Sequence, residues 1–314
     1  MSARLLLRVL LLVQAAAVLA IGAALWRAGF GRWLALAAGL GAVVLVRLLI
    51  NANNFRLSRR SASATPQQFR LGAAARLQLF GEEFTASLLQ SSWTMPRALA
   101  CQSVFADSKA PPVLLLHGYG CNSGYWSALT RRLCAARISH ATLDLEPITG
   151  AIDGYVPQVQ RAVDKLCRET GAAKVVVVAH SMGGLVARAW LRAHGSARVA
   201  RVITLGTPHH GTCLASFGMG SNAAQMRRGA DGVESWWLRD LAAGEGAATR
   251  ALITSIYSHH DNIVSPQTSS HLEGANNIEF GGVGHVALGR NRRVLDRVMQ
   301  EIAAAAWTKA GDGR

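Results

Sequence analysis

The feature that most constrains the fold is a series of short, continuously apolar runs separated by helical patterns. A strand that is apolar throughout is buried on both faces, and strands that alternate with helices form a parallel sheet with helices on both sides. We therefore predict an α/β domain over residues 112–314. The runs that we assign to strands are 112–116, 141–145, 174–179, 199–205 and 252–257.

Two long apolar runs precede this domain. Residues 9–26 contain no charged side chain and one polar side chain, Gln14. As a helix they would span about 27 Å of the roughly 30 Å hydrocarbon core of a bilayer. Residues 33–50 are interrupted only by Arg47, whose long side chain can reach the lipid headgroups. We predict a transmembrane helical hairpin over residues 1–50.

The positive charge of the chain is concentrated at this end. Residues 1–81 hold ten arginines and no acidic residue, so they carry ten of the fifteen net positive charges. These arginines flank apolar runs and do not alternate with stacking aromatic residues, which favours membrane lipids and excludes nucleic acid as the main partner. Because arginines outside the hairpin outnumber those in its connecting loop, both flanks are expected in the cytoplasm. We predict a multi-pass protein of a bacterial-type inner (cytoplasmic) membrane, with the α/β domain on the cytoplasmic side.

Other interpretations of the N-terminal segments stay open. The first apolar run could also be a cleaved signal peptide or part of a soluble helical hairpin, although no clear cleavage site is present and a second apolar run follows. Residues 51–111 form a juxtamembrane linker and the start of the catalytic domain. Within them, 51–63 is polar and basic, which suits anionic headgroups. The mixed helical spacing of apolar residues in 66–90 predicts a segment that either lies on the membrane or caps the domain.

A serine stands where the strand 174–179 meets the following helix, in the sequence Ala-His-Ser-Met-Gly. To lift the Ser181 hydroxyl above the sheet the chain must reverse within a few residues, which requires small side chains two positions before and two after it. Ala179 and Gly183 meet that requirement. Because active sites of parallel sheets lie at the carboxyl ends of the strands, we predict Ser181 as a nucleophile.

A serine nucleophile needs a base, and the base needs a carboxylate to orient it. In this fold the acid and then the histidine follow the serine along the chain. Asp261 comes four residues after a predicted strand, and His285 lies 24 residues later. We predict Asp261 as the acid and His285 as the base, with Asp231 and Asp240 as rival acids.

The developing oxyanion requires hydrogen-bond donors, which we expect to be the backbone N–H groups of Tyr119 and Met182. The adjacent pair His209-His210 is interpreted as structural, because neighbouring residues point apart and no third metal ligand has suitable spacing. We predict no metal and no cofactor.

The chain resembles the α/β-hydrolase superfamily, and within it the bacterial lipases and esterases. The resemblance covers residues 112–307. It is carried by Asp261, His285 and three stretches: Leu-His-Gly-Tyr-Gly at 116–120, Ala-His-Ser-Met-Gly-Gly at 179–184 and Thr-Leu-Gly-Thr-Pro-His-His-Gly at 204–211. The last stretch is typical of lipases and related lipid-modifying hydrolases. Alanine at residue 179 replaces the usual glycine. The resemblance implies an α/β-hydrolase fold and hydrolysis of esters with fatty acyl chains; some related lipases bind structural calcium, for which no ligand cluster is identified in this sequence.

We therefore predict a membrane-anchored serine hydrolase of carboxylic esters, a lipase or esterase that acts on acyl lipids through an acyl-serine intermediate. An acyltransferase using the same triad is one alternative, and a non-catalytic membrane scaffold is another. Residues 212–246 are expected to form either a mobile apolar lid or an ordinary cap. Their larger apolar side chains are Phe217, Met219, Met226, Trp236 and Trp237.

Overall fold

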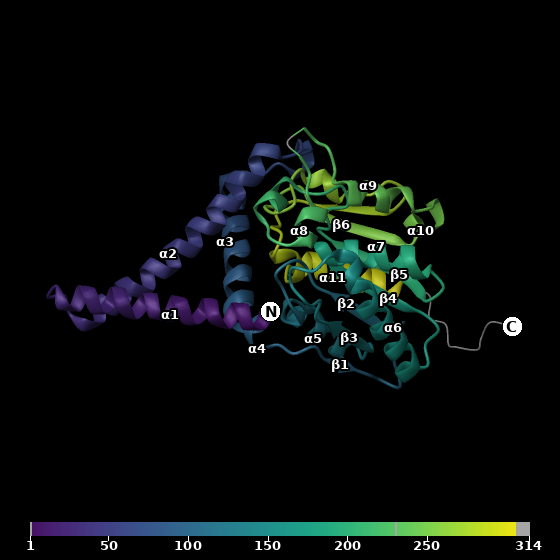
Figure 1. Cartoon of the computed structure of the whole chain (residues 1–314), viewed down its shortest axis with the longest axis horizontal. Coiled ribbons are helices and arrows are strands. Elements are labelled where there is room, and N and C mark those ends of the chain that lie inside the picture. Colours follow the sequence, from purple (N-terminus) through teal and green to yellow (C-terminus); the bar gives the residue numbers. More distant parts are fainter. Residues whose placement is uncertain (1, 230, 306–314) are drawn as a thin grey trace.

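The computed structural model of the chain describes residues 2–229 and 231–305, so residues 306–314 of the predicted catalytic domain lie outside the described residues. Its centre is a seven-stranded sheet with the order β1-β3-β2-β4-β5-β6-β7 (Figure 1). All neighbouring strands are parallel except β1, which is antiparallel to β3. The strands are β1 (Gln102–Ser103), β2 (Val113–Leu116), β3 (His140–Leu143), β4 (Val175–His180), β5 (Val199–Leu205), β6 (Ile253–Ser258) and β7 (Asn276–Phe280).

The central strands are apolar because both faces of the sheet are covered. Along β2, Val113 and Leu115 belong to one buried cluster, whereas Leu114 and Leu116 belong to the other. The valines of β4 alternate in the same way. The predicted mostly parallel sheet with helices on both faces is therefore confirmed.

Helices α6 and α7 pack on one face of the sheet, and α5 and α11 pack on the other. In α6 an apolar stripe from Val156 to Leu166 is buried, and the helix ends at Gly171, which has a φ of 67°. The longer helices of the domain are α5 (Ser127–Ala135), α6 (Val156–Thr170), α7 (Met182–His194), α9 (Trp236–Ala243) and α11 (Arg292–Ala303). The short ones are α4 (Met95–Arg97), α8 (Ser221–Gln225) and α10 (Ala247–Ala251), with single turns η4 (Ser123–Trp126), η5 (Ile152–Tyr155), η6 (Cys213–Phe217), η7 (Gln267–Ser270) and η8 (Ala287–Gly289).

The two N-terminal apolar runs form the helices α1 (Ala3–Arg27) and α2 (Arg32–Ser58), joined by a short turn. Both are long and apolar enough to cross a membrane. They project from the domain as a hairpin, with the turn at the far end (Figure 1). Their large apolar side chains are mostly in contact with solvent, and Trp33 beside the turn is 72% exposed. These helices are therefore not core helices of the α/β domain.

Helix α3 (Ala73–Leu89) lies across the open end of the hairpin, between α1 and α2 on one side and the sheet domain on the other (Figure 1). Short turns, η1 (Arg59–Ser61) and η2 (Gln67–Phe69), lead into it, and a π-helical turn, η3 (Gln90–Thr94), follows it. Leu79, Glu83 and Ala86 are buried, and Ala86 joins the cluster on the α5 and α11 face. Of the two expectations for this segment, α3 therefore meets the one in which it caps the domain.

Two arginines hydrogen-bond the open end of the hairpin to the turns that follow α3. Arg8 donates a hydrogen bond to the Pro96 carbonyl (2.9 Å). Arg47 donates to the Gln14 side-chain oxygen (2.8 Å) and to the hydroxyls of Ser91 (3.2 Å) and Ser92 (2.9 Å). Arg47, expected from the sequence to reach the lipid headgroups, bonds in this structure to protein oxygens from α1 and η3.

Candidate active site

Ser181 occupies a sharp turn between β4 and α7. Its backbone has φ 53° and ψ −124°, a strained conformation for a residue with a side chain. The Ser181 N–H donates to the Leu205 carbonyl (2.9 Å), and the Ser181 carbonyl accepts from the Thr207 hydroxyl (2.9 Å). A Cβ on Gly183 would lie 2.5 Å from the Leu116 carbonyl oxygen, so the turn leaves no room for a larger residue. The tight turn predicted from the small residues is confirmed.

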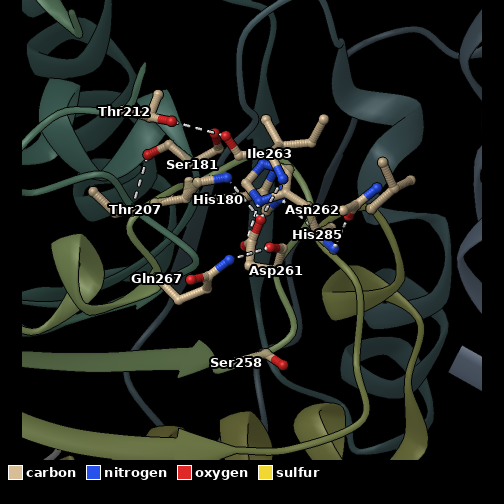
Figure 2. Close-up of polar contacts among 12 residues, drawn as sticks. His180, Ser181, Thr207, Thr212, Ser258, Asp261, Asn262, Ile263, Gln267 and His285 are labelled. Carbon is tan, nitrogen blue, oxygen red and sulfur yellow. Dashed lines mark hydrogen bonds and ion pairs between the residues drawn. The ribbon is translucent and has the colours of Figure 1, made fainter. Parts of the chain in front are cut away.

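Asp261 and His285 form a buried acid–base pair at the carboxyl end of the sheet (Figure 2). The Asp261 Oδ2 atom accepts from His285 Nδ1 at 2.7 Å, while Asp261 Oδ1 accepts from the backbone N–H groups of Ile263 (2.8 Å) and Val264 (2.7 Å). Three donors therefore fix the carboxylate. Nδ1 carries the proton that it shares with Asp261. The Nε2 atom of the neutral imidazole is therefore free to accept a second proton.

The strand ends bring this pair next to the serine turn. Gly206 follows Leu205, the backbone partner of Ser181, and a Cβ on it would lie 3.1 Å from Asp261 Oδ2 and 3.2 Å from His285 Nδ1. In the described part of the chain no hydrogen bond joins the Ser181 hydroxyl to His285. Such contacts are commonly long in enzymes without substrate and tighten in the reacting complex. The structure thus places all three predicted residues in one site.

The three side chains are shielded from solvent: Ser181 is 7% exposed, His285 4% and Asp261 2%. Burial by itself lowers the pKa of His285, but the charge and hydrogen bond of Asp261, together with the charge of Glu83, raise it above the ordinary value. The imidazole is therefore a stronger base than a free histidine. A raised pKa of His285 favours removal of the proton from a serine hydroxyl.

His180, the residue before the serine, is a further buried neighbour that the sequence patterns did not identify. Its ring stacks on Tyr125 at a centroid distance of 4.1 Å, and its Nε2 lies 3.2 Å from the His285 carbonyl oxygen. Burial and the nearby charge of His285 lower the pKa of His180 well below its ordinary value, so it is neutral. We interpret His180 as a support for the His285 backbone.

The residues predicted as oxyanion donors also lie at the serine turn. Met182 is the first residue of α7, and Gly118 is so close to the turn that a Cβ on it would lie 2.9 Å from Ser181 Cβ. In the described structure, the N–H groups of Tyr119 and Met182 donate to no other protein atom and can therefore donate to a ligand oxygen. The Tyr119 hydroxyl contacts Met219, donating to its carbonyl (2.8 Å) and accepting from its N–H (2.9 Å).

The rival acids and the histidine pair have other partners. Asp240 forms an ion pair with Arg192 (2.7 Å), and Asp231 accepts from the Val233 N–H (3.0 Å). His209 is buried, with its Nδ1 3.4 Å from the guanidinium of Arg188, whereas the His210 ring bonds to Glu234 (2.8 Å). The two rings therefore face different partners, as adjacent residues are expected to do.

Residues 212–246 pack against the domain through part of their apolar side chains. Met226 and Trp237 are buried in the cluster on the α6 and α7 face, and the Trp237 Nε1–H donates to Asp153 (2.6 Å). Phe217, Met219 and Trp236 instead are at least 70% exposed. The segment is thus anchored like a cap but presents apolar side chains to its surroundings.

The family profile that describes the alpha/beta hydrolase fold matches residues 111–260. Triacylglycerol lipases of Burkholderia plantarii and Pseudarthrobacter phenanthrenivorans are each 32% identical, over 126 and 114 residues. The matches cover 37% and 34% of this chain, and the chain spans only 35% of the length of either relative.

Solved structures with the same fold include the mature form of a lipase from Bacillus licheniformis and lipase B from Aspergillus fumigatus. Both are 18% identical, with TM-scores of 0.56 and 0.54. The alignments cover 65% of this chain and 97% of the first structure, and 66% of this chain and 56% of the second. The domain that carries Ser181, Asp261 and His285 therefore has the α/β-hydrolase fold, and part of it is similar in sequence to bacterial triacylglycerol lipases.

Proposed function

We propose that this protein is a membrane-anchored serine hydrolase of carboxylic esters, of the lipase or esterase type. The observation that carries the proposal is the buried Asp261–His285 pair beside the strained turn of Ser181. The similarity to triacylglycerol lipases and the lipase-like residues 204–211 support an ester substrate.

In the proposed reaction, His285 Nε2 takes the Ser181 hydroxyl proton as Ser181 Oγ attacks the ester carbonyl carbon. The backbone N–H groups of Tyr119 and Met182 stabilise the oxyanion, and such donors contribute several kcal/mol when preorganised. Collapse of the intermediate breaks the bond to the leaving oxygen, which receives the proton from His285 and departs as an alcohol. Water, activated by the same imidazole, then releases the acid and restores Ser181.

We propose acyl lipids as the substrate class. The support is twofold: the domain is joined to two helices that are long and apolar enough to cross a bilayer, and exposed apolar side chains lie on residues 212–246. Because Ser181 is almost fully covered, a long acyl chain needs a local opening to reach it. Phe217 and Met219 are exposed, and the Met219 backbone is hydrogen-bonded to the Tyr119 hydroxyl of the oxyanion loop, so both side chains are suited to line such an entrance.

The full-length protein in detergent is expected to release a burst of p-nitrophenol from p-nitrophenyl butyrate and palmitate, because p-nitrophenol leaves as the acyl-serine forms and we expect water to remove the acyl group more slowly. The burst should equal the amount of protein labelled by a fluorophosphonate probe. Absence of labelling would contradict the proposed enzymatic function and favour the interpretation as a non-catalytic scaffold. Transfer of the acyl group to an added alcohol in preference to water would favour the acyltransferase.

We further propose that α1 and α2 cross a cytoplasmic membrane and that both hairpin ends lie in the cytoplasm with the domain. Both ends of the hairpin adjoin the domain in Figure 1, and the arginines are concentrated at these ends. Alkaline phosphatase fused after residue 60 is expected to be inactive, because alkaline phosphatase folds into its active form only after export from the cytoplasm. The matched fusion after Gly29, in the hairpin turn, should be active. The reverse pattern would overturn the orientation.

A further inference from the structure

Glu83 belongs to α3, before the α/β domain predicted over residues 112–314, yet its carboxylate reaches the loop that carries His285. The Glu83 Oε1 atom accepts from the Val286 N–H (3.0 Å) and Oε2 accepts from the Ala287 N–H (2.9 Å). On the other side of His285, a Cβ on Gly284 would lie 2.4 Å from Glu83 Oε2. The carboxylate therefore contacts the loop both before and after the catalytic base.

A second acceptor completes this support. The Asn262 side-chain oxygen accepts from the N–H of His285 itself (3.0 Å). Three successive backbone N–H groups, those of His285, Val286 and Ala287, are thus held by side chains that approach from different parts of the chain. A loop fixed in this way restricts the direction in which the imidazole points.

The carboxylate of Glu83 is 1% exposed and forms no ion pair with an arginine or lysine among the described residues. Burying such a group is unfavourable unless it is hydrogen-bonded or faces a positive charge. Burial raises the pKa of Glu83 above its ordinary value, and the charge of Asp261 adds to that rise, whereas the two backbone hydrogen bonds and the charge of His285 act against it. The protonated imidazole of His285 is therefore a positive group that the buried carboxylate can stabilise.

We propose that Glu83 is a positioning residue for His285, so that the helix following the anchor supplies part of the active site. The proposal rests on the proposed serine hydrolase function. The carboxylate holds the loop 284–287 so that the imidazole stays between Asp261 and Ser181. Its charge also favours the imidazolium that forms when Ser181 loses its proton.

The test compares Glu83→Gln with Glu82→Gln in the full-length protein in detergent. Glu82 lies on the same helix and bonds to the Asn291 side chain (2.7 Å), not to the His285 loop. Glutamine at residue 83 can accept one of the two backbone hydrogen bonds but presents an N–H₂ group to the other donor. We expect kcat to fall about 10-fold to 100-fold, as for a slightly misplaced catalytic group, with little change in KM. Glu82→Gln should match the wild type.

A pH profile separates positioning from a merely structural role. Without the carboxylate the imidazolium is less favoured, so the acid limb of kcat/KM should move to lower pH in Glu83→Gln. In Glu83→Asp, which keeps the charge but shortens the reach, the limb should stay in place while kcat falls. The Glu83→Asp variant also tests the positioning role if the Glu83→Gln protein folds poorly.

Two outcomes overturn the proposal while leaving the hydrolase function intact. One is an unchanged kcat and pH profile in Glu83→Gln. The other is a loss explained entirely by fewer fluorophosphonate-reactive molecules, each with wild-type kcat and an unmoved acid limb. If instead the wild-type protein neither hydrolyses esters nor reacts with the probe, the proposed function itself fails.

Discussion

Replacing Ser181 with alanine is expected to lower kcat by about 10⁴-fold to 10⁶-fold, the range found when the nucleophile of a catalytic triad is removed. The physical reason is that no covalent acyl-enzyme can form without the hydroxyl. Residual hydrolysis would come from water attacking an ester held by the oxyanion donors. Initial rates with p-nitrophenyl butyrate, and the burst amplitude, measure the effect.

The control for this substitution is Ser196→Ala, at an exposed loop serine between α7 and β5. It should keep the wild-type rate and the wild-type labelling by a fluorophosphonate. Ser181→Ala should keep the wild-type melting temperature within a few degrees, because only one oxygen is lost. Substantial probe labelling or burst hydrolysis in Ser181→Ala would mean that another residue is the nucleophile.

The central strands and the serine turn were predictable from the sequence because their causes are local. Continuous burial requires continuous apolar residues, and the predicted strand 199–205 coincides with β5 (Val199–Leu205). The turn at Ser181 requires small neighbours whatever the rest of the chain does. The positions of Asp261 and His285 followed from the order of strands and loops, since the carboxyl ends of parallel strands meet at one edge of the sheet.

The supports of the site were not predictable in this way because they join residues far apart in the chain. Glu83 reads in the sequence as one more polar residue of an amphipathic helix, and only the packing of α3 on the domain brings it to Val286 and Ala287. Arg47 resembles an arginine at a membrane boundary, but its partners come from α1 and η3. The available signal was an acidic residue at helical spacing from the apolar positions Leu79 and Ala86, which indicates a polar partner but does not identify it.

Replacing Asp261 with asparagine is expected to lower kcat by about 10⁴-fold, because the amide no longer holds the imidazole in the tautomer with a free Nε2. Asparagine can offer an N–H to His285 Nδ1, which would place the ring proton on the wrong nitrogen. The remaining activity should also respond differently to pH. Since the charge of Asp261 raises the pKa of His285 against the effect of burial, its removal lowers that pKa. The acid limb of kcat/KM should therefore move to lower pH.

Asp240→Asn is the matched control, because this rival acid forms a partly exposed ion pair with Arg192, and such pairs contribute little to stability. It should keep nearly the full rate and the wild-type pH profile. Activity measured between pH 5 and 9 for both variants distinguishes the two acids. If Asp240→Asn loses activity while Asp261→Asn keeps it, the short contact between Asp261 and His285 is structural and the orienting carboxylate lies on the segment 212–246. If Asp261→Asn alone is impaired, the role of the three donors to its carboxylate is to fix that group beneath the base.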